Sequence, residues 1–119
     1  MKFQPSNSYF VDDNTEITDL FDAPQDSNFD AVLSEVDGYH PEGEKGKRIF
    51  NERSQKGYYI LEGEGKLFVG EETHNVEEGD YVYVPEKTLH ALEGSLKALI
   101  ITSPPFNPED EELRNWNEP

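Results

Sequence analysis

Hydrophobic and polar residues alternate with a period of two along most of this 119-residue chain, as is typical of half-buried β-strands. The strand-like segments are short and rich in tyrosine, phenylalanine, isoleucine and valine, which suit the pleated surface of a sheet. Glycine, proline and polar residues separate them, without a helical period in between. The pattern predicts eight or nine strands, near residues 9–11, 17–21, 29–36, 48–51, 56–62, 66–69, 72–76, 80–84 and 96–102.

The strongest of these signals spans residues 56–69, where two strand-like runs flank Gly63-Glu64-Gly65. Because glycine permits the positive φ of a tight reversal, we expect a β-hairpin here. Further turns are expected at residues 70–72, 77–80 and 93–95, where glycine meets acidic or small polar residues. This succession of short strands predicts an all-β barrel or sandwich.

The C-terminal segment departs from the strand pattern. Asn107 stands where a helix N-cap belongs, Pro108 follows at the first helical position, and acidic residues fill the first turn. We therefore expect a short helix whose Leu113 and Trp116 dock on the barrel.

Length and composition limit the class of protein. A chain of 119 residues fits one domain, which we divide into an N-terminal arm with short strands (1–28), a barrel (29–102) and a Pro-rich acidic tail (103–119). The lack of cysteine excludes disulfides and thiolate chemistry and is compatible with a reducing compartment. The sequence offers neither a signal-peptide core nor an apolar run of about 18 residues, so we expect a cytoplasmic protein without a membrane partner.

The charge of the chain excludes further partners. Twenty-six acidic against ten basic residues give a formal net charge of −16, which repels phosphate backbones and anionic lipids, so nucleic acid is not an expected partner. This acidity fits either adaptation to high salt or simply a highly soluble surface. Half of the basic residues cluster within twelve positions and could draw an anionic small molecule, or could form a solvated connection: Lys45, Lys47, Arg48, Arg53 and Lys56.

Two spaced motifs resemble those of the cupin superfamily. The first, GxxxxxHxHxxxxExxxxxxG, matches the spacing from Gly43 to Gly63, and the second, GxxxxxPxGxxHxxxN, matches Gly79, Pro85 and His90. The resemblance covers residues 29–101, and the tail from Ser103 also resembles the ending of single-domain cupins. It implies a cupin-like double-stranded β-helix, the jelly-roll barrel, followed here by the expected short C-terminal helix.

The resemblance also implies where a metal would bind, because the family holds its metal with two His and a Glu of the first motif and the His of the second. Those positions carry Ile49, Asn51, Lys56 and His90 in this chain, so the motif is degenerate. Ile cannot coordinate, Asn is a poor donor, and an ammonium has no lone pair and repels a divalent cation. We expect no metal and no other cofactor at this position. Glu52 or Gln55 could supply ligands if the register before Lys56 shifts. His40, in a loop beside Pro41, or His74, in a strand bordered by turns, could also reach the pocket.

Strand alternation suggests what fills the barrel, because residues two apart share a face. If Lys56 points inward, then Tyr58 and Ile60 do so too, and the family pattern places Val82 and Val84 beside them. An apolar floor below a few polar groups is how small-molecule sites are built.

These polar groups lead to the main functional hypothesis, a barrel that binds a small polar or anionic molecule without metal. Its ligand-binding residues would be Asn51, Lys56, Tyr58 and His90, with Lys56 as counter-charge. In the purely structural alternative, Lys56 lies in solvent or pairs with a glutamate such as Glu52 or Glu62, while His90 caps a buried backbone carbonyl.

A cupin enzyme is the alternative function, of isomerase, epimerase or oxygenase type. It would be metal-dependent through replacement ligands or would use Lys56 and His90 as candidate catalytic residues, for proton transfer or Schiff-base chemistry.

The outward aromatics of the predicted barrel are Tyr59, Tyr81 and Tyr83. An exposed patch of this kind would be an interaction surface, and cupins commonly dimerise through a barrel face. The resemblance therefore implies a homodimer, unless the arm or the tail of the same chain covers these side chains.

Overall fold

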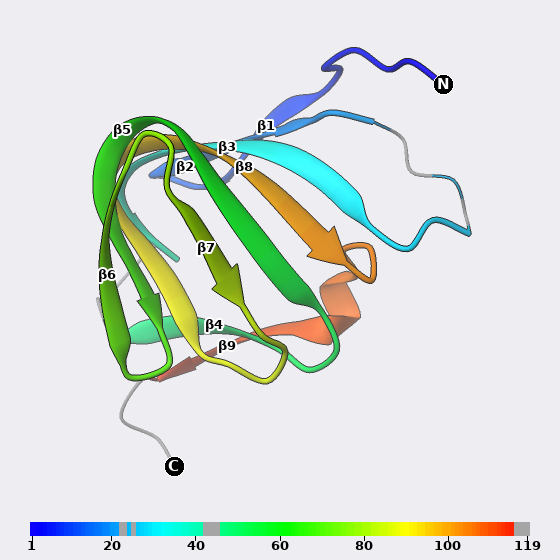
Figure 1. Cartoon of the computed structure of the whole chain (residues 1–119). Coiled ribbons are helices and arrows are strands. Elements are labelled where there is room, and N and C mark those ends of the chain that lie inside the picture. Colours follow the sequence, from blue (N-terminus) through cyan, green and yellow to red (C-terminus); the bar gives the residue numbers. More distant parts are fainter. Residues whose placement is uncertain (22–23, 25, 42–45, 116–119) are drawn as a thin grey trace.

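The computed structural model describes residues 1–21, 24, 26–41 and 46–115. These residues form nine strands and one turn of 3₁₀ helix (Figure 1). The elements are β1 (Ser8–Asp12), β2 (Thr15–Asp19), β3 (Asp30–His40), β4 (Lys47–Asn51), β5 (Gln55–Val69), β6 (Glu72–Glu77), β7 (Tyr81–Val84), β8 (His90–Ser103), η1 (Pro108–Asp110) and β9 (Glu111–Asn115). None of the helical residues described here forms a segment long and apolar enough to cross a membrane.

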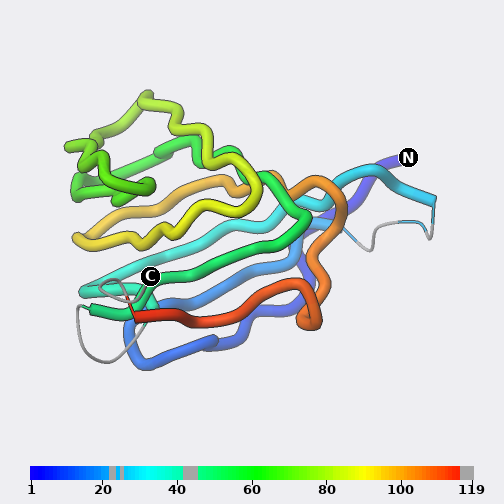
Figure 2. The backbone as a smooth tube through the Cα atoms, turned by 90° about the horizontal axis from the view of Figure 1, so that it is seen from below, coloured from blue at the N-terminus to red at the C-terminus, as the bar shows by residue number. Residues whose placement is uncertain are grey.

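All nine strands belong to one antiparallel sheet that curls into a barrel-like shape (Figure 1), so the all-β jelly-roll expectation is confirmed. The long strand β8 lies at its centre, with β3 paired along one edge and β5 along the other. The two halves of β5 also pair with β7 and β6. Strand β4 pairs with β8 at Ile49 and His90, and carries β9 on its other edge. Figure 2 shows β9 beside β4, on the side of the molecule where the N-terminal hairpin also lies.

The inner face of the curled sheet holds the hydrophobic core. Its fully buried members are apolar residues from strands β5, β7 and β8, such as Ile60, Val84 and Ala98. The predicted alternation along β5 is present, since Tyr58 and Ile60 are buried whereas Tyr59 is exposed. The strands thus aim one set of side chains inward without any help from a helix.

The hairpin expected at residues 56–69 is wrong, because β5 runs through it as one continuous strand of 15 residues. The glycines serve a different purpose: a Cβ on Gly63 or Gly65 would lie 2.1 or 2.2 Å from a backbone oxygen of β8. Glycine is therefore needed for the close pairing with β8 and not for a reversal.

The turn expected at residues 93–95 is wrong for a related reason. Strand β8 continues through Gly94, which has a φ of +137° and faces Gly65 across the strand pair. Strand β3 likewise continues past the expected stop at Asp37-Gly38 and ends only at His40. Two glycines in register let long strands bend sharply while they stay paired.

The expected C-terminal helix is also wrong, since the tail forms one 3₁₀ turn and then strand β9. The start signal is real: the side chain of Asn107 accepts a hydrogen bond from the backbone N–H of Glu109. The chain then pairs with the free edge of β4, where the Arg114 guanidinium lies 3.7 Å from the centre of the Phe50 ring. Tertiary pairing overrides the local helix propensity. Leu113 stays exposed, and Trp116 lies outside the described residues.

Candidate functional site

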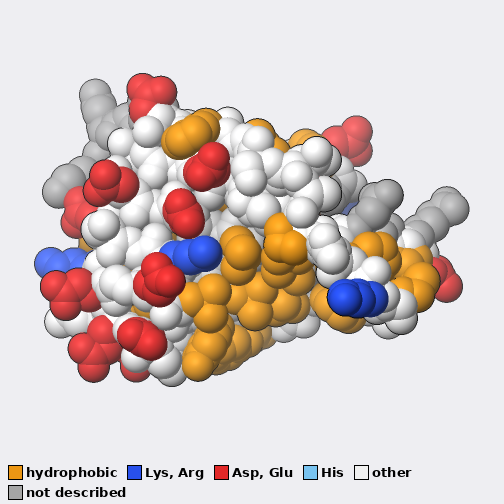
Figure 3. All heavy atoms as spheres, turned by 90° about the horizontal axis from the view of Figure 1, so that it is seen from above, with side chains coloured by type: hydrophobic (Ala, Val, Ile, Leu, Met, Phe, Trp, Pro, Cys, Tyr) orange, Lys and Arg blue, Asp and Glu red, His pale blue; other side chains and the backbone are white. Residues whose placement is uncertain are grey.

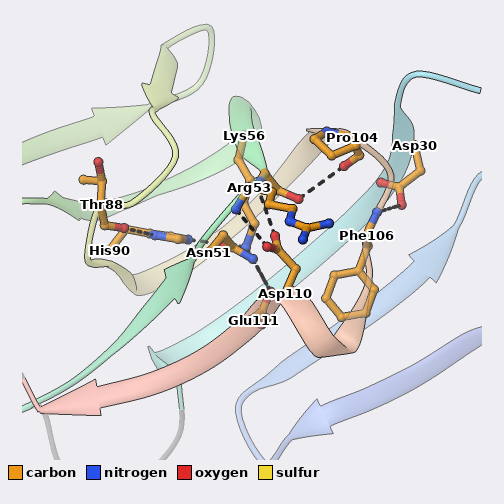
Figure 4. Close-up of polar contacts among 11 residues, drawn as sticks. Asp30, Asn51, Arg53, Lys56, Thr88, His90, Pro104, Phe106, Asp110 and Glu111 are labelled. Atoms are coloured by element: carbon orange, nitrogen blue, oxygen red, sulfur yellow. Dashed lines mark hydrogen bonds and ion pairs between the residues drawn. The ribbon is translucent and has the colours of Figure 1, made fainter.

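A cluster of polar side chains is buried beneath the β4–β9 pair (Figure 4). Asn51 ends β4, Lys56 follows on β5, His90 begins β8, and Glu111 begins β9. Asn51, Lys56 and His90 are 2%, 8% and 1% exposed, whereas the Glu111 side chain keeps 25% of its surface. Buried polar groups are costly unless they find partners, so the contacts inside this cluster decide what it can do.

His90 is locked in one tautomer by its neighbours. Its Nδ1 lies 2.9 Å from the carbonyl oxygen of Thr88, which can only accept, so Nδ1 carries the proton. Its Nε2 therefore presents a lone pair, and the Lys56 ammonium donates to it from 3.3 Å. Burial first, and the positive charge of Lys56 second, lower the pKa of His90 to about 3. His90 is a neutral acceptor for the ammonium at any ordinary pH.

Lys56 has a second partner in the Glu111 carboxylate, whose Oε2 lies 3.4 Å from Nζ. The same oxygen accepts from the Asn51 amide nitrogen at 3.2 Å, which fixes the orientation of that amide. As a result the amide oxygen of Asn51 is buried and finds no hydrogen-bond donor in the described part of the chain. An ammonium has three donors and Lys56 uses two on these partners. Lys56 thus keeps one ammonium donor, and Asn51 keeps its amide oxygen, for a further partner.

Glu111 reaches the cluster because the preceding residue fastens the tail. The carboxylate of Asp110 accepts from the backbone N–H groups of Arg53 and Ser54 at 2.8 and 3.1 Å. These bonds tie the 3₁₀ turn to the β4–β5 connection (Figure 4). The next residue is then held over Asn51 and Lys56.

Tyr58 completes the inner wall of the cluster. It is 3% exposed, and its ring meets the His90 ring edge-on with centroids 6.4 Å apart. Burial raises the pKa of Tyr58, so its hydroxyl stays protonated.

On its outer side, Glu111 lines a pocket of about 380 Å³ between the N- and C-terminal strands. The other lining residues are Val11, Asp12, His40, Pro41, Ile49 and Leu113. Within it, Nδ1 of His40 and Oδ2 of Asp12 are 2.6 Å apart. Burial raises the pKa of Asp12, but hydrogen bonds from His40 and from the Asn14 amide outweigh it, so the net pKa lies below its usual value.

Comparison with protein families agrees with the barrel fold described above. Residues 38–102 match the family described as the cupin domain, which is more than half of the chain. The chain belongs to the cupin family. A 64-residue stretch is 41% identical to the uncharacterized protein MJ1618 of Methanocaldococcus jannaschii, and the alignment spans 50% of this cupin and 51% of that relative.

Solved structures share the fold of this cupin at low identity. The nucleoside dehydratase Pac13 of Streptomyces superposes with a TM-score of 0.82 at 24% identity, over 97% of this chain and 91% of that one. A Pac13 variant with uridine gives the same score. KdgF from Halomonas sp. follows at 0.71 and 16% identity over 92% and 96% of the chains, and ectoine synthase from P. lautus at 0.68 and 16% over 92% and 88%.

The residues at the family's metal position do not fit a metal ion in this cupin. Lys56 places an ammonium against His90 Nε2, the lone pair that would bind the ion, and Ile49 contributes no donor atom. No group of three or more His, Cys, Asp or Glu side chains in the described part of the chain could hold one. The positive charge at this position is carried by the Lys56 side chain.

The residues considered as replacement ligands lie elsewhere. Glu52 faces solvent with Lys87 3.9 Å away, and Gln55 accepts from the Tyr83 hydroxyl on the outside of the barrel. His74 is paired with Glu72 on β6.

The structure brings together the four residues predicted for the barrel site: Asn51, Lys56, Tyr58 and His90. It adds three that the sequence analysis missed or misplaced: Asp12, His40 and Glu111. Lys56 pairs neither with Glu52 nor with Glu62 but with Glu111, whose segment the cap signal had assigned to a helix. His40 was expected in a loop yet ends β3 against Asp12. Only the tertiary pairing of the two chain ends reveals these residues, so no local signal could have found them.

Proposed function

We propose that this cupin binds a small polar organic molecule at the Asn51–Lys56–Tyr58–His90 cluster, without metal, and that a neutral hydroxylated compound fits better than an anion. The observation that carries the proposal is the pair of unused groups in the cluster. The third donor of Lys56 and the unpartnered oxygen of Asn51 belong to two side chains that both donate to the same oxygen of Glu111. A hydroxyl group both donates and accepts, so it matches this pair.

The charge balance of the cluster favours a neutral ligand. Lys56 was the expected counter-charge for an anion, but Glu111 already offsets it, and His90 is neutral. An added anion would face the Glu111 carboxylate on a molecule with a net charge of −16. Uridine, present in the Pac13 structures, is a neutral polyhydroxylated molecule and lends support to this class.

The test is ligand-dependent melting in excess chelator, with uridine as the neutral probe and gluconate as the anionic one. We expect uridine to raise the melting temperature with increasing concentration, since a ligand of the folded state stabilises it, and gluconate to have a smaller effect. Asn51→Leu removes the unpartnered oxygen at similar volume and should abolish the shift, whereas Asn75→Leu on exposed β6 should not. A shift that needs added metal, or survives Asn51→Leu, contradicts the proposal.

A second candidate function is catalysis by Lys56 and His90, supported by the 3.3 Å between their nitrogens. Schiff-base chemistry needs a neutral amine at Lys56. Borohydride trapping with dihydroxyacetone, followed by peptide mass spectrometry, should then label Lys56 in preference to the exposed Lys66. Equal labelling of the two lysines counts against this route.

We also propose that a second copy of the chain covers the outward tyrosines. Tyr59, Tyr81 and Tyr83 are 41%, 62% and 54% exposed on β5 and β7. Figure 3 shows a contiguous hydrophobic patch on the upper face of the molecule, with acidic side chains gathered to one side. A large apolar patch on an otherwise acidic surface is typical of an interface. Light scattering should give a dimer at micromolar concentration, and a monomer for Tyr81→Lys with Tyr83→Lys; a monomeric wild type contradicts the proposal.

A further inference from the structure

The pocket on the outer side of Glu111 contains a second pair of titratable groups that the barrel cluster does not use. Asp12 ends β1 and His40 ends β3, the two strands that flank β2, and His40 Nδ1 lies 2.6 Å from Asp12 Oδ2. Val11, Ile49 and Leu113 line the same pocket and give it apolar walls. Such a combination of polar groups and apolar lining is typical of a site for a small molecule.

The contact with Asp12 fixes the tautomer of His40. The pKa of Asp12 is below its usual value, so the carboxylate is ionised and can only accept; Nδ1 of His40 therefore carries the proton. In the neutral imidazole the opposite ring nitrogen, Nε2, then carries the lone pair, and it has no hydrogen-bond partner among the described residues. A neutral imidazole whose far side is held by a carboxylate is oriented as a general base.

Glu111 lines the same pocket as His40 and has the Lys56 ammonium 3.4 Å behind it. We propose that this pocket is a proton-transfer site, in which His40 Nε2 removes a proton from the carbon next to a carbonyl group and Glu111 delivers one to the carbonyl oxygen. The substrate class is a neutral hydroxylated aldehyde or ketone. This inference rests on the proposed function, because it assigns a reaction to the ligand bound beside the cluster.

The proposed step balances without any further reactant. The proton of Lys56 passes to Glu111 and on to the carbonyl oxygen, while His40 takes the carbon-bound proton. The electrons of the C–H bond form the new C=C bond, and the π electrons of the carbonyl become the O–H bond. The product is an enediol, with an imidazolium at His40 and a neutral amine at Lys56. In the return step the second hydroxyl of the enediol gives its proton through Glu111 to Lys56 and becomes the new carbonyl. The C=C electrons take the His40 proton at the original carbonyl carbon, which gives the isomeric hydroxy-carbonyl compound.

Deuterium exchange tests the inference directly. We expect the protein in D₂O to incorporate deuterium into dihydroxyacetone and D-glyceraldehyde, followed by proton NMR, faster than buffer alone. His40→Gln should reduce exchange to the buffer rate, since a general base contributes about 10²–10⁴-fold. The matched control is His74→Gln at a half-buried histidine of β6 outside the pocket, which should exchange like the wild type.

Asp12 is a positioning residue, so its test needs a spectroscopic readout as well as a rate. In the wild type, long-range ¹H–¹⁵N correlation should show Nδ1 of His40 protonated. Asp12→Asn should give a mixture of tautomers and slow exchange at least tenfold, while Asp12→Glu should restore both. A wild-type His40 protonated on Nε2, or exchange unaffected by Asp12→Asn, overturns the inference.

The outcomes separate this inference from the proposed function. If uridine stabilises the wild type in chelator while neither carbonyl probe exchanges, binding stands and the proton-transfer site is wrong. If exchange occurs and is lost in His40→Gln but uridine does not bind, the reaction stands and the proposed binding of uridine-like molecules at the Asn51–Lys56–Tyr58–His90 cluster is wrong. Absence of both counts against both. Melting temperatures of His40→Gln and Asp12→Asn close to the wild type exclude loss of folding as the cause.

Discussion

At the scale of single residues, the important feature is the positive charge of the buried Lys56 side chain. Lys56 occupies the place of a carboxylate ligand, and its ammonium satisfies both the His90 lone pair and the Glu111 carboxylate. A buried charge is tolerated only when it is paired, so the three side chains depend on one another.

Removing the amine should therefore destabilise the protein. We expect Lys56→Met to lower the free energy of unfolding by about 2–3 kcal/mol, less than for a fully buried pair because Glu111 is partly exposed. Adding Glu111→Gln to Lys56→Met should recover part of this loss, with a coupling of about 1 kcal/mol or more. Urea unfolding measures these values. The control Lys66→Met removes an exposed lysine of β5 and should leave the free energy of unfolding nearly unchanged. Additive effects of the two substitutions would show that the pair is not coupled.

The depressed pKa of His90 makes stability depend on pH. A pKa of about 3 in the folded state lies below the usual 6.5, so the unfolded chain binds more protons between these values. This contribution is complete above pH 6.5 and is lost as the pH falls toward 3. Over that range it is on the order of a few kcal/mol. We expect the difference in unfolding free energy between wild type and His90→Gln to shrink from pH 7.5 to pH 5 in urea unfolding, and parallel curves would contradict this.

At the scale of elements, the sequence predicts where strands occur better than where they end. The period of two fixes the inward faces of β5 and β7, and tyrosines 59, 81 and 83 lie outward as expected. Glycine was ambiguous, because it permits both a reversal and a close strand pair; the contacts of Gly63 and Gly94 across β5 and β8 distinguish the two. Long-range pairing, which no local pattern encodes, also decides where His40 and Glu111 lie.

The close pairing of β5 and β8 makes a quantitative prediction for Gly94. A Cβ there would lie 2.6 Å from the Glu64 oxygen and from the Gly65 Cα, at a φ of +137°. The matched control is Gly79, which also has positive φ but nothing within 4 Å of an added Cβ. Gly79→Ala should cost only the backbone term of about 1–2 kcal/mol. Gly94→Ala should lower the free energy of unfolding by about 1–3 kcal/mol more than Gly79→Ala, because the added Cβ overpacks the contact with β5. Equal losses in urea unfolding would contradict the role of the contact.

Strand β9 connects the fold to the site, because it both covers β4 and delivers Glu111. Truncation after Asp110 should therefore lower the free energy of unfolding by about 3 kcal/mol or more, since Ile49 and Phe50 lose their cover and Lys56 loses its carboxylate. It should also abolish the uridine-dependent shift. The control is truncation after Asn115, which keeps β9 and should retain both properties. Loss of binding in both truncations would assign the effect to residues beyond β9.

At the scale of the whole molecule, the net charge of −16 works against the compact state. Acidic residues even face each other across strands: Glu64 pairs with Glu77 between β5 and β6, and Glu16 with Glu35 between β2 and β3. Like charges in directly opposed positions are destabilising. Salt shortens the screening length from about 10 Å at 0.1 M to about 3 Å at 1 M. The melting temperature should therefore rise with sodium chloride.

The cross-strand pair allows local repulsion to be separated from total charge. Glu64→Lys places an opposite charge against Glu77 and should stabilise the protein by about 0.2–1 kcal/mol at low salt, with a smaller gain at 1 M salt. Glu71→Lys changes the net charge equally but lies in the β5–β6 turn, outside the paired register. If the two variants gain the same stability in urea unfolding at both salt concentrations, the repulsion is global. A larger gain for Glu64→Lys that disappears in salt would assign the repulsion to the opposed Glu64–Glu77 pair. We expect this result, because salt screens exposed charges more strongly than it affects packing.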